Sequence, residues 1–201
     1  MARQGDLFRS TSELCPDGFG MPELALSAQL LRSWQERLAQ FQAPLFRGDP
    51  ASQGQTSLFL PEANGPGALA ARINPLSLQP QPLSFWRWTA SAQKGAAVYF
   101  VLDRPPGLPQ PLLLYVGETG RADQRWKGEH DCKRYLASYG EALAKVGMEG
   151  RPSIRFWLDV PRDLRPRREL EQALIRRWQP PFNKETRDRW TTPFTAANET
   201  P

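Results

Sequence analysis

Residues 112 to 126, LLLYVGETGRADQRW, combine a hydrophobic run with side chains that could do chemistry. Val or Ile is more usual than Tyr115 in a buried strand, and strand propensity requires neither Gly117 nor Arg125. A phenol can orient or deprotonate an attacking water, and a guanidinium can hold a phosphate through two hydrogen bonds. These residue types suit the hydrolysis of a phosphate ester.

Glu171 could supply a carboxylate for a hard cation. Phosphodiester hydrolysis needs a nucleophilic water, neutralised phosphoryl oxygens and a stabilised leaving oxygen, which one divalent metal, an arginine and a base can provide. Glu171 is offset by one position from the apolar stripe that contains Leu170 and Leu174. Its carboxylate could therefore lie at the edge of the core and face a cleft where Mg²⁺ or Mn²⁺ could bind. Position alone favours a solvated surface glutamate, because most helix carboxylates lie at a surface.

Short motifs follow one another in a definite order through the second half of the chain. AVY occupies 97–99 and YVG occupies 115–117, Arg125 lies ten residues beyond Tyr115, and ELEQALIRRWQPPFN at 169–183 contains Glu171 and Asn183. This ordered set resembles the GIY-YIG nuclease family over about residues 95–185. The first motif departs from the family pattern, because it reads AVY where the family has GIY.

The resemblance implies a metal-dependent DNA endonuclease with Mg²⁺ or Mn²⁺ bound at Glu171. Tyr99 and Tyr115 would lie near each other on paired strands, one activating the water and the other holding the scissile phosphate, and either could be the base. Arg125 would clamp the transition-state phosphate and Asn183 would fix the loop over the site. Their alternative roles are core tyrosines, a surface ion pair and a turn asparagine.

Residues close to these motifs carry further expectations. His130, the only histidine, lies five residues past Arg125, and it would be a proton shuttle, a phosphate ligand or a surface imidazole. Glu118 stands where relatives in the family often have Lys or a small polar residue, and Lys127 would compensate for the missing cation. Gly117 is expected to let the backbone turn sharply. Four residues are expected to contact DNA: Gly117, Lys127, Arg176 and Arg177.

The composition favours an intracellular protein with an anionic partner. Of 201 residues, 40% are hydrophobic, enough for one core and an appended arm. The formal net charge of +5 comes mainly from Arg, which favours nucleic acid as the partner. Cys15 and Cys132 are too few for a disulfide scaffold or a four-cysteine zinc site. No apolar run approaches the ~20 residues that cross a bilayer, so we expect no membrane partner and a cytoplasmic, nucleoid-associated protein.

Hydrophobic periodicity predicts an α+β fold, with a small three-stranded antiparallel sheet flanked by helices. The strands are expected at 97–102, 112–117 and 153–160. The helices are expected at about 22–41, 122–128, 132–146 and 166–178, with Gly140 as a break. The chain would divide into a largely flexible N-terminal arm with a Pro/Gln-rich linker, a GIY-YIG-like domain and a tail: 1–84, 85–190 and 191–201.

A pentapeptide, Gln followed by two variable residues, Leu and Phe, occurs three times, at 4–8, 42–46 and 55–59. The copies resemble the clamp-binding peptide of bacterial replication and repair proteins, which implies a sliding clamp as a partner. In the middle copy, Leu45 and Phe46 could instead cap the preceding helix. The other two copies supply the expected contacts: Gln4, Leu7, Phe8, Gln55, Leu58 and Phe59.

The leading expectation is a metal-dependent DNA endonuclease of repair or recombination, recruited by the sliding clamp. A non-catalytic nucleic-acid-binding module on the same scaffold is the main alternative, favoured by AVY, Glu118 and the displaced His130. A restriction or mobile-element nuclease is the third, although such an enzyme should carry an evident target-recognition domain. The preferred DNA structure and the oligomeric state stay open.

We predict that a fragment of residues 1–90 binds a bacterial-type sliding clamp. Leu58→Ala with Phe59→Ala should weaken binding more than the same changes at Leu45 and Phe46, because the former pair has no obvious core to join. Titration of the fragment against purified clamp by calorimetry measures both. Undetectable binding at tens of micromolar would eliminate the clamp as a partner.

Overall fold

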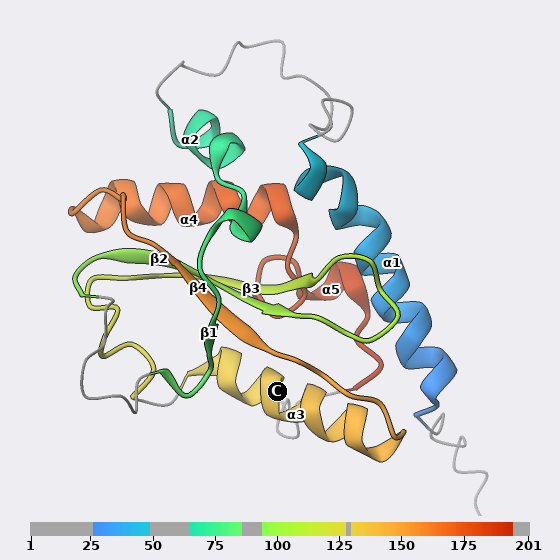
Figure 1. Ribbon diagram of the computed structural model, residues 1–201. Helices are drawn as coiled ribbons and strands as arrows, with labels where there is room; N and C mark the ends of the chain where they lie inside the picture. The colour runs from blue at the N-terminus through green and yellow to red at the C-terminus, as the bar shows by residue number, and fades with distance from the viewer. Residues whose placement is uncertain (1–25, 49–64, 86–93, 128–129, 195–201) are drawn as a thin grey trace, which may run out of the picture.

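The computed structural model describes residues 26–48, 65–85, 94–127 and 130–194, which form an α+β fold around one antiparallel sheet (Figure 1). The α+β class and the antiparallel pairing confirm the prediction from sequence. The sheet has four strands in the order β1-β4-β2-β3, not three. Its strands are β1 (Gln81–Pro82), β2 (Ala97–Asp103), β3 (Leu112–Thr119) and β4 (Ser153–Trp157).

The extra strand, β1, is too short to be seen in a hydrophobic pattern. Its two residues pair with β4 through Gln81 opposite Ile154 and Pro82 opposite Ser153. Pro is tolerated at such a sheet edge because it lacks only the N–H that an inner strand would need. β2 is central and buried along its whole length, as its continuous apolar sequence AVYFVL requires.

Helices cover both faces of the sheet. On one face, α2 (Pro66–Arg72) and α4 (Leu164–Trp178) share a core with Val98 and Phe100 of β2. On the other face, α3 (Asp131–Lys145) and a turn at 122–127 pack near Tyr99 and Val101. A four-residue helix, α5 (Arg187–Trp190), follows α4. Among the described residues, no helix is both long enough and apolar enough to cross a membrane.

The first helix is displaced from its expected position at 22–41. α1 spans Ala28–Arg47. Its N-cap is Ser27, whose hydroxyl accepts the Leu30 N–H at 3.1 Å, and its C-cap is Gly48, with φ of 76°. Its last turn therefore includes Leu45 and Phe46, which are 4% and 6% exposed. Those two side chains belong to the core, so the middle QxxLF copy is a packing element of α1.

The described part of the predicted linker is docked on the domain. The helix α2 packs against α4, and Asn74 donates to the Phe46 carbonyl at 2.8 Å. Arg155 of β4, 7% exposed, donates to carbonyls of the short 3-10 turn Pro75–Ser77 and of Leu78. The segment also places the apolar side chains of Ala70 and Ile73 in the core, but α2 has only seven residues, too few to show a clear periodic pattern.

Three further expectations about helices differ from the structure. Residues 122–127 form turns rather than a helix. Gly140 lies inside α3 without breaking it, and a Cβ there would meet no atom within 4 Å. The last helix starts at Leu164, two residues before Pro166, because Pro can occupy any position in the first turn, where the backbone N–H has no helical partner.

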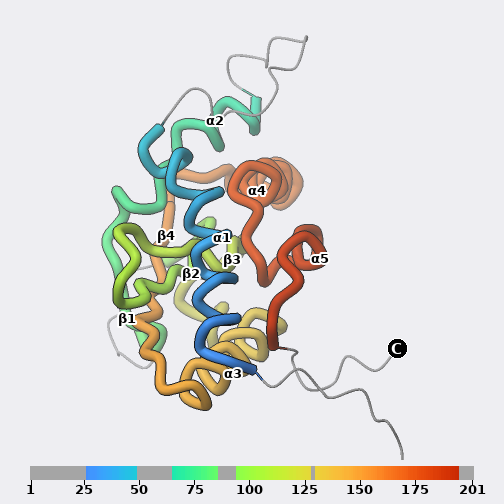
Figure 2. Tube along the Cα trace, turned by 90° about the vertical axis from the view of Figure 1, so that its right-hand side faces the viewer, coloured from blue at the N-terminus to red at the C-terminus, as the bar shows by residue number. Residues whose placement is uncertain are grey.

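α1 packs against β3 and, in the side view, runs in front of β2 and β3 (Figure 2). Its first half packs with α3 through Trp34 and Tyr139, whose ring centroids lie 5.9 Å apart. In the second half of α1, the buried Gln42 amide donates to the Leu113 carbonyl at 2.9 Å and accepts the Leu113 N–H at 2.8 Å. It also donates to the Trp178 carbonyl at 3.1 Å. This one side chain joins α1, β3 and α4.

We predict that Gln42→Leu lowers the free energy of unfolding by about 2–4 kcal/mol, because the change leaves the buried Leu113 N–H and two carbonyls without partners. Urea denaturation followed by circular dichroism measures the loss. Gln40→Leu, at an exposed position of α1, is the matched control and should change stability by less than ~0.5 kcal/mol. Equal effects of the two substitutions would contradict the bridging role of Gln42.

Candidate active site

Two tyrosines and a glycine meet where β2 pairs with β3. Tyr99 lies opposite Gly117 in the register, and the Tyr99 and Tyr115 rings lie 5.9 Å apart at 30°. A Cβ at residue 117 would overlap the Tyr99 ring and would lie 2.8 Å from Cε1 of Tyr115. Gly117 is therefore buried within β3 and makes room for both rings, which corrects the expectation of a sharp backbone turn there. A buried glycine is also poorly placed for the direct DNA contact expected of it.

Tyr99 contacts Arg125 and is closed off from solvent. Its side chain is 0% exposed, and its hydroxyl accepts a hydrogen bond from Nε of Arg125 at 3.2 Å. Burial raises the pKa of Tyr99 well above its ordinary value, and the neighbouring Tyr115 raises it further while Arg125 opposes the rise. The phenol is thus neutral, and it orients the guanidinium of Arg125.

Tyr115 is the tyrosine that reaches a cleft. It is half-buried and lines a cleft of about 170 Å³ together with Glu171 and Asn183. Burial raises the pKa of Tyr115 to about 12, so its hydroxyl is protonated at neutral pH. It can donate one hydrogen bond and accept another.

Glu171 is held at this cleft by the backbone of β3. Its Oε1 accepts the Glu118 N–H at 2.9 Å. Burial raises the pKa of Glu171 to about 7, and the carboxylates of Glu118 and Glu185 raise it as well, whereas the hydrogen bond from the Glu118 N–H and the nearby Arg168 lower it. Because burial is the main cause, a cation bound beside this half-buried carboxylate would stabilise its ionised form.

Two arginines that the sequence analysis did not single out hold Glu118. Arg167, whose side chain is 4% exposed, donates from Nε to Oε2 of Glu118 at 2.7 Å and to the carbonyls of Pro161 and Arg162. Nε of Arg168 lies 3.7 Å from Oε1 of Glu118. Positive charge at this point thus comes from α4, whereas Lys127 is an exposed residue of the 122–127 turn. Arg167 and Arg168 lie four and three residues before Glu171 on the same helix face, and this spacing could have indicated from the sequence that they lie near the site.

Asn183 fastens the segment after α4 to the outer edge of β3. Its side chain accepts the Val116 N–H at 2.9 Å and donates to the Val116 carbonyl at 2.8 Å. The adjacent Phe182 N–H donates to the Leu114 carbonyl at 3.0 Å. Asn183 is 4% exposed and acts as a substitute for a fifth strand at this point.

His130 lies beside Arg125 and does not line the cleft. It precedes α3, and its ring centroid lies 4.8 Å from that of Trp126 at 88°. Burial lowers the pKa of His130 to about 4, and the nearby Arg125 and Lys133 also lower it. The imidazole is therefore neutral at physiological pH, and neither ring nitrogen has a hydrogen-bond partner among the described residues.

The remaining expected contact residues do not converge on the cleft. Arg176 is exposed and lines a separate groove on α4. Arg177 is half-buried, with its Cζ 5.9 Å from the Trp178 ring. Six residues expected to bind the clamp lie outside the described residues: Gln4, Leu7, Phe8, Gln55, Leu58 and Phe59.

The side chains at the cleft can be compared with the ligands that a metal ion requires. In the part of the chain that the structure describes, no group of three or more His, Cys, Asp or Glu side chains is placed to hold a metal ion. Glu171 is the half-buried cleft carboxylate, and Asp131 and Glu185 line other parts of the cleft. A one-carboxylate site fits Mg²⁺, which commonly keeps several waters and takes its other ligands from substrate phosphates.

Comparisons of the chain with known protein families, with curated proteins and with solved structures find no match.

We predict that Gly117→Ala lowers the free energy of unfolding by about 1–3 kcal/mol, because the new methyl group forces the Tyr99 and Tyr115 rings apart. Thermal or urea unfolding measures this change. Gly140→Ala is the matched control, and it should raise stability by about 0.5–1 kcal/mol because residue 140 lies in an open helical position. A neutral or stabilising Gly117→Ala would disprove the close approach.

Proposed function

We propose that the protein is a metal-dependent endonuclease that hydrolyses DNA phosphodiester bonds. The observation that carries the proposal is the meeting of Tyr115, Glu171 and Asn183 at one cleft, next to an Arg125 that a buried Tyr99 orients. These residues come from five separate segments of the chain. They are also the residues through which the sequence resembles the GIY-YIG nucleases.

Glu171 is the proposed ligand for Mg²⁺ or Mn²⁺. Its Oε1 is fixed by the Glu118 N–H, and the described hydrogen bonds leave Oε2 free to face a cation. A divalent ion bound there would supply Lewis-acid activation of water and charge neutralisation at the phosphate. The burial that raises the Glu171 pKa supports this assignment, because a bound cation would stabilise the ionised carboxylate.

The two tyrosines have different proposed roles. Tyr115 lines the cleft, and as a neutral phenol it would orient the attacking water or a phosphate oxygen by hydrogen bonding. Tyr99 is fully buried, so it is a positioning residue that acts through Arg125. Arg125 would bind the phosphoryl oxygens, and its guanidinium matches their geometry.

A non-catalytic nucleic-acid-binding module is the second candidate. The observation that favours it is the lack, among the described residues, of any group of three metal-ligating side chains. The two candidates share a DNA partner and differ in metal-dependent turnover. The sliding clamp is a further proposed partner, through the QxxLF copies at 4–8 and 55–59, because the copy at 42–46 is buried in α1.

We predict that Glu171→Gln reduces Mg²⁺- or Mn²⁺-dependent DNA cleavage by at least a hundredfold, because the amide retains the hydrogen bond from Glu118 but carries no charge for the cation. Cleavage of flapped, branched, mismatched and intact duplexes by purified protein, with and without EDTA, measures the loss. Glu141→Gln, at an exposed position of α3, is the control.

The same assay separates the two tyrosines. Tyr115→Phe should lower turnover by about ten- to a hundredfold with little change in DNA affinity, since the hydroxyl acts on the reacting groups. Tyr99→Phe releases Arg125 and should also lower turnover. A higher Mg²⁺ concentration should partly restore the turnover of this variant. Cleavage by Glu171→Gln at the rate of the native protein would refute the metal assignment, and binding without cleavage by the native protein would favour the second candidate.

A further inference from the structure

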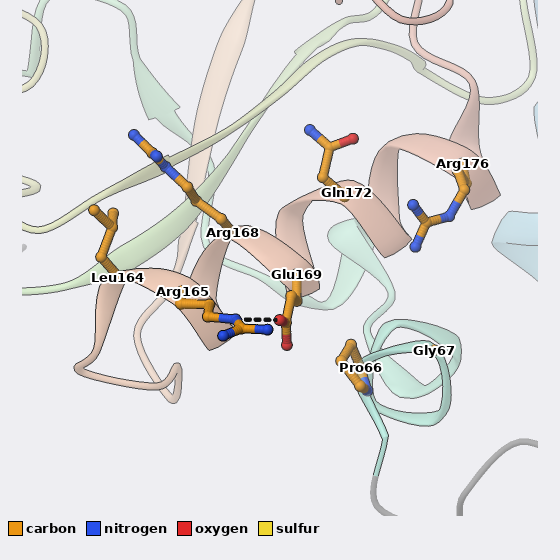
Figure 3. A pocket seen from close by; sticks show the side chains of 8 residues that line it. All are labelled: Pro66, Gly67, Leu164, Arg165, Arg168, Glu169, Gln172 and Arg176. Carbon is orange, nitrogen blue, oxygen red and sulfur yellow. Dashed lines mark hydrogen bonds and ion pairs between the residues drawn. The ribbon is translucent and has the colours of Figure 1, made fainter.

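A groove larger than the catalytic cleft lies between α2 and the outer face of α4. Its volume is about 650 Å³, compared with about 170 Å³ for the cleft. Pro66 and Gly67 form the α2 side (Figure 3). The α4 side consists of Leu164, Arg165, Arg168, Glu169, Gln172 and Arg176.

The charge of this groove is positive and accessible. Three arginines and one glutamate line it, and the Arg165 and Arg168 side chains are 91% and 64% exposed. Arg165 pairs with Glu169 at 3.2 Å. An exposed pair of this kind contributes at most ~1 kcal/mol, so an incoming anion can displace the glutamate.

The groove adjoins the catalytic cleft around one helix. Gln172 lines the groove, and its amide donates at 2.8 Å to Glu185, which lines the cleft. Arg168 also lines the groove and contacts Glu118, whose N–H holds Glu171. A polymer bound at Glu171 can therefore continue into the groove by passing over α4.

We propose that this groove binds the sugar-phosphate backbone of the DNA strand that flanks the scissile bond, an inference that rests on the proposed nuclease function. Arg165 and Arg176 mark two ends of the groove, about 16 Å apart at the helical rise of ~1.5 Å per residue. This length spans several successive phosphates of one strand, whose axial spacing is ~3.4 Å. Guanidinium groups match phosphate geometry, and the exposed Leu164 and Pro66 can pack against sugars.

The first test is DNA binding by Arg165→Ala with Arg176→Ala. Fluorescence anisotropy with a labelled 20-base-pair duplex in EDTA, repeated at several salt concentrations, measures affinity without cleavage. We expect affinity to fall on the order of tenfold and the slope of log K against log salt to decrease by about 1.8, or ~0.9 for each lost phosphate contact. Arg168 is left intact because it also contacts Glu118.

The matched control is Arg151→Ala. This side chain is 68% exposed and belongs to the segment between α3 and β4. Its loss removes one positive charge, as the loss of each groove arginine does, so effects are compared per removed charge. Its effect on affinity and on the salt slope should be small. Equal effects of Arg151 and of the groove arginines would show that net charge alone drives binding, and would overturn the proposal.

Glu169→Gln is expected to change binding in the opposite direction. It removes the carboxylate that pairs with Arg165, so it should strengthen duplex binding several-fold. Unchanged binding by Glu169→Gln together with unchanged binding by the double arginine variant would overturn the groove assignment. The same anisotropy titration with an RNA duplex is a further check. If the double arginine variant lost affinity for RNA more than for DNA, the groove would bind a different nucleic acid and the proposal would be overturned.

These outcomes are separable from failure of the nuclease proposal. Cleavage by the native protein, combined with native-like binding and cleavage by the double variant, would retain the nuclease and reject the groove. DNA binding that depends on Arg165 and Arg176, without cleavage by the native protein, would retain the groove as a DNA site and reject catalysis.

Discussion

The arrangement of this protein depends on how the outer edge of β3 is satisfied. β3 ends the sheet, and an exposed edge presents backbone N–H and C=O groups that must find partners when buried. Here those partners are the side chains of Gln42, Glu171 and Asn183 and the backbone of Phe182. They come from α1, α4 and the segment after α4. One strand edge therefore holds three separate parts of the chain in a single arrangement.

This constraint links stability to the proposed chemistry. Glu171 and Asn183 satisfy the edge of β3 and, through the same contacts, are fixed at the cleft with Tyr115. Arg167 extends the fixed set, because it is buried and binds the Glu118 carboxylate while the Glu118 N–H holds Glu171. Burial is the main reason why ionisation of the Glu171 carboxylate is unfavourable in the free protein, and a bound cation would relieve that cost. The proposed site is thus prearranged for a cation by contacts that also maintain the fold.

Elements with long apolar patterns were predicted to within a few residues. β2 and β3 extend one and two residues beyond the predicted 97–102 and 112–117, and α3 differs by one residue at each end from 132–146. The elements β1 and α2 were missed, because two and seven residues are too few to show a periodic apolar pattern. The end of α1 was misplaced because Pro44 and Gln42 look like loop residues, whereas both lie in the helix.

The amino-acid sequence by itself determined the residue types of the proposed site, their order along the chain and the α+β class. Side-chain chemistry and periodicity are local properties, so they can be read without coordinates. Only the tertiary structure decided that Tyr115 lines the cleft while Tyr99 is buried against Arg125, and that Gly117 makes room for both rings. It also paired Arg167 with the carboxylate of Glu118, which lies 49 residues away in the sequence. Burial and long-range pairing depend on which surfaces meet when the sheet and helices pack, and no local pattern encodes that meeting.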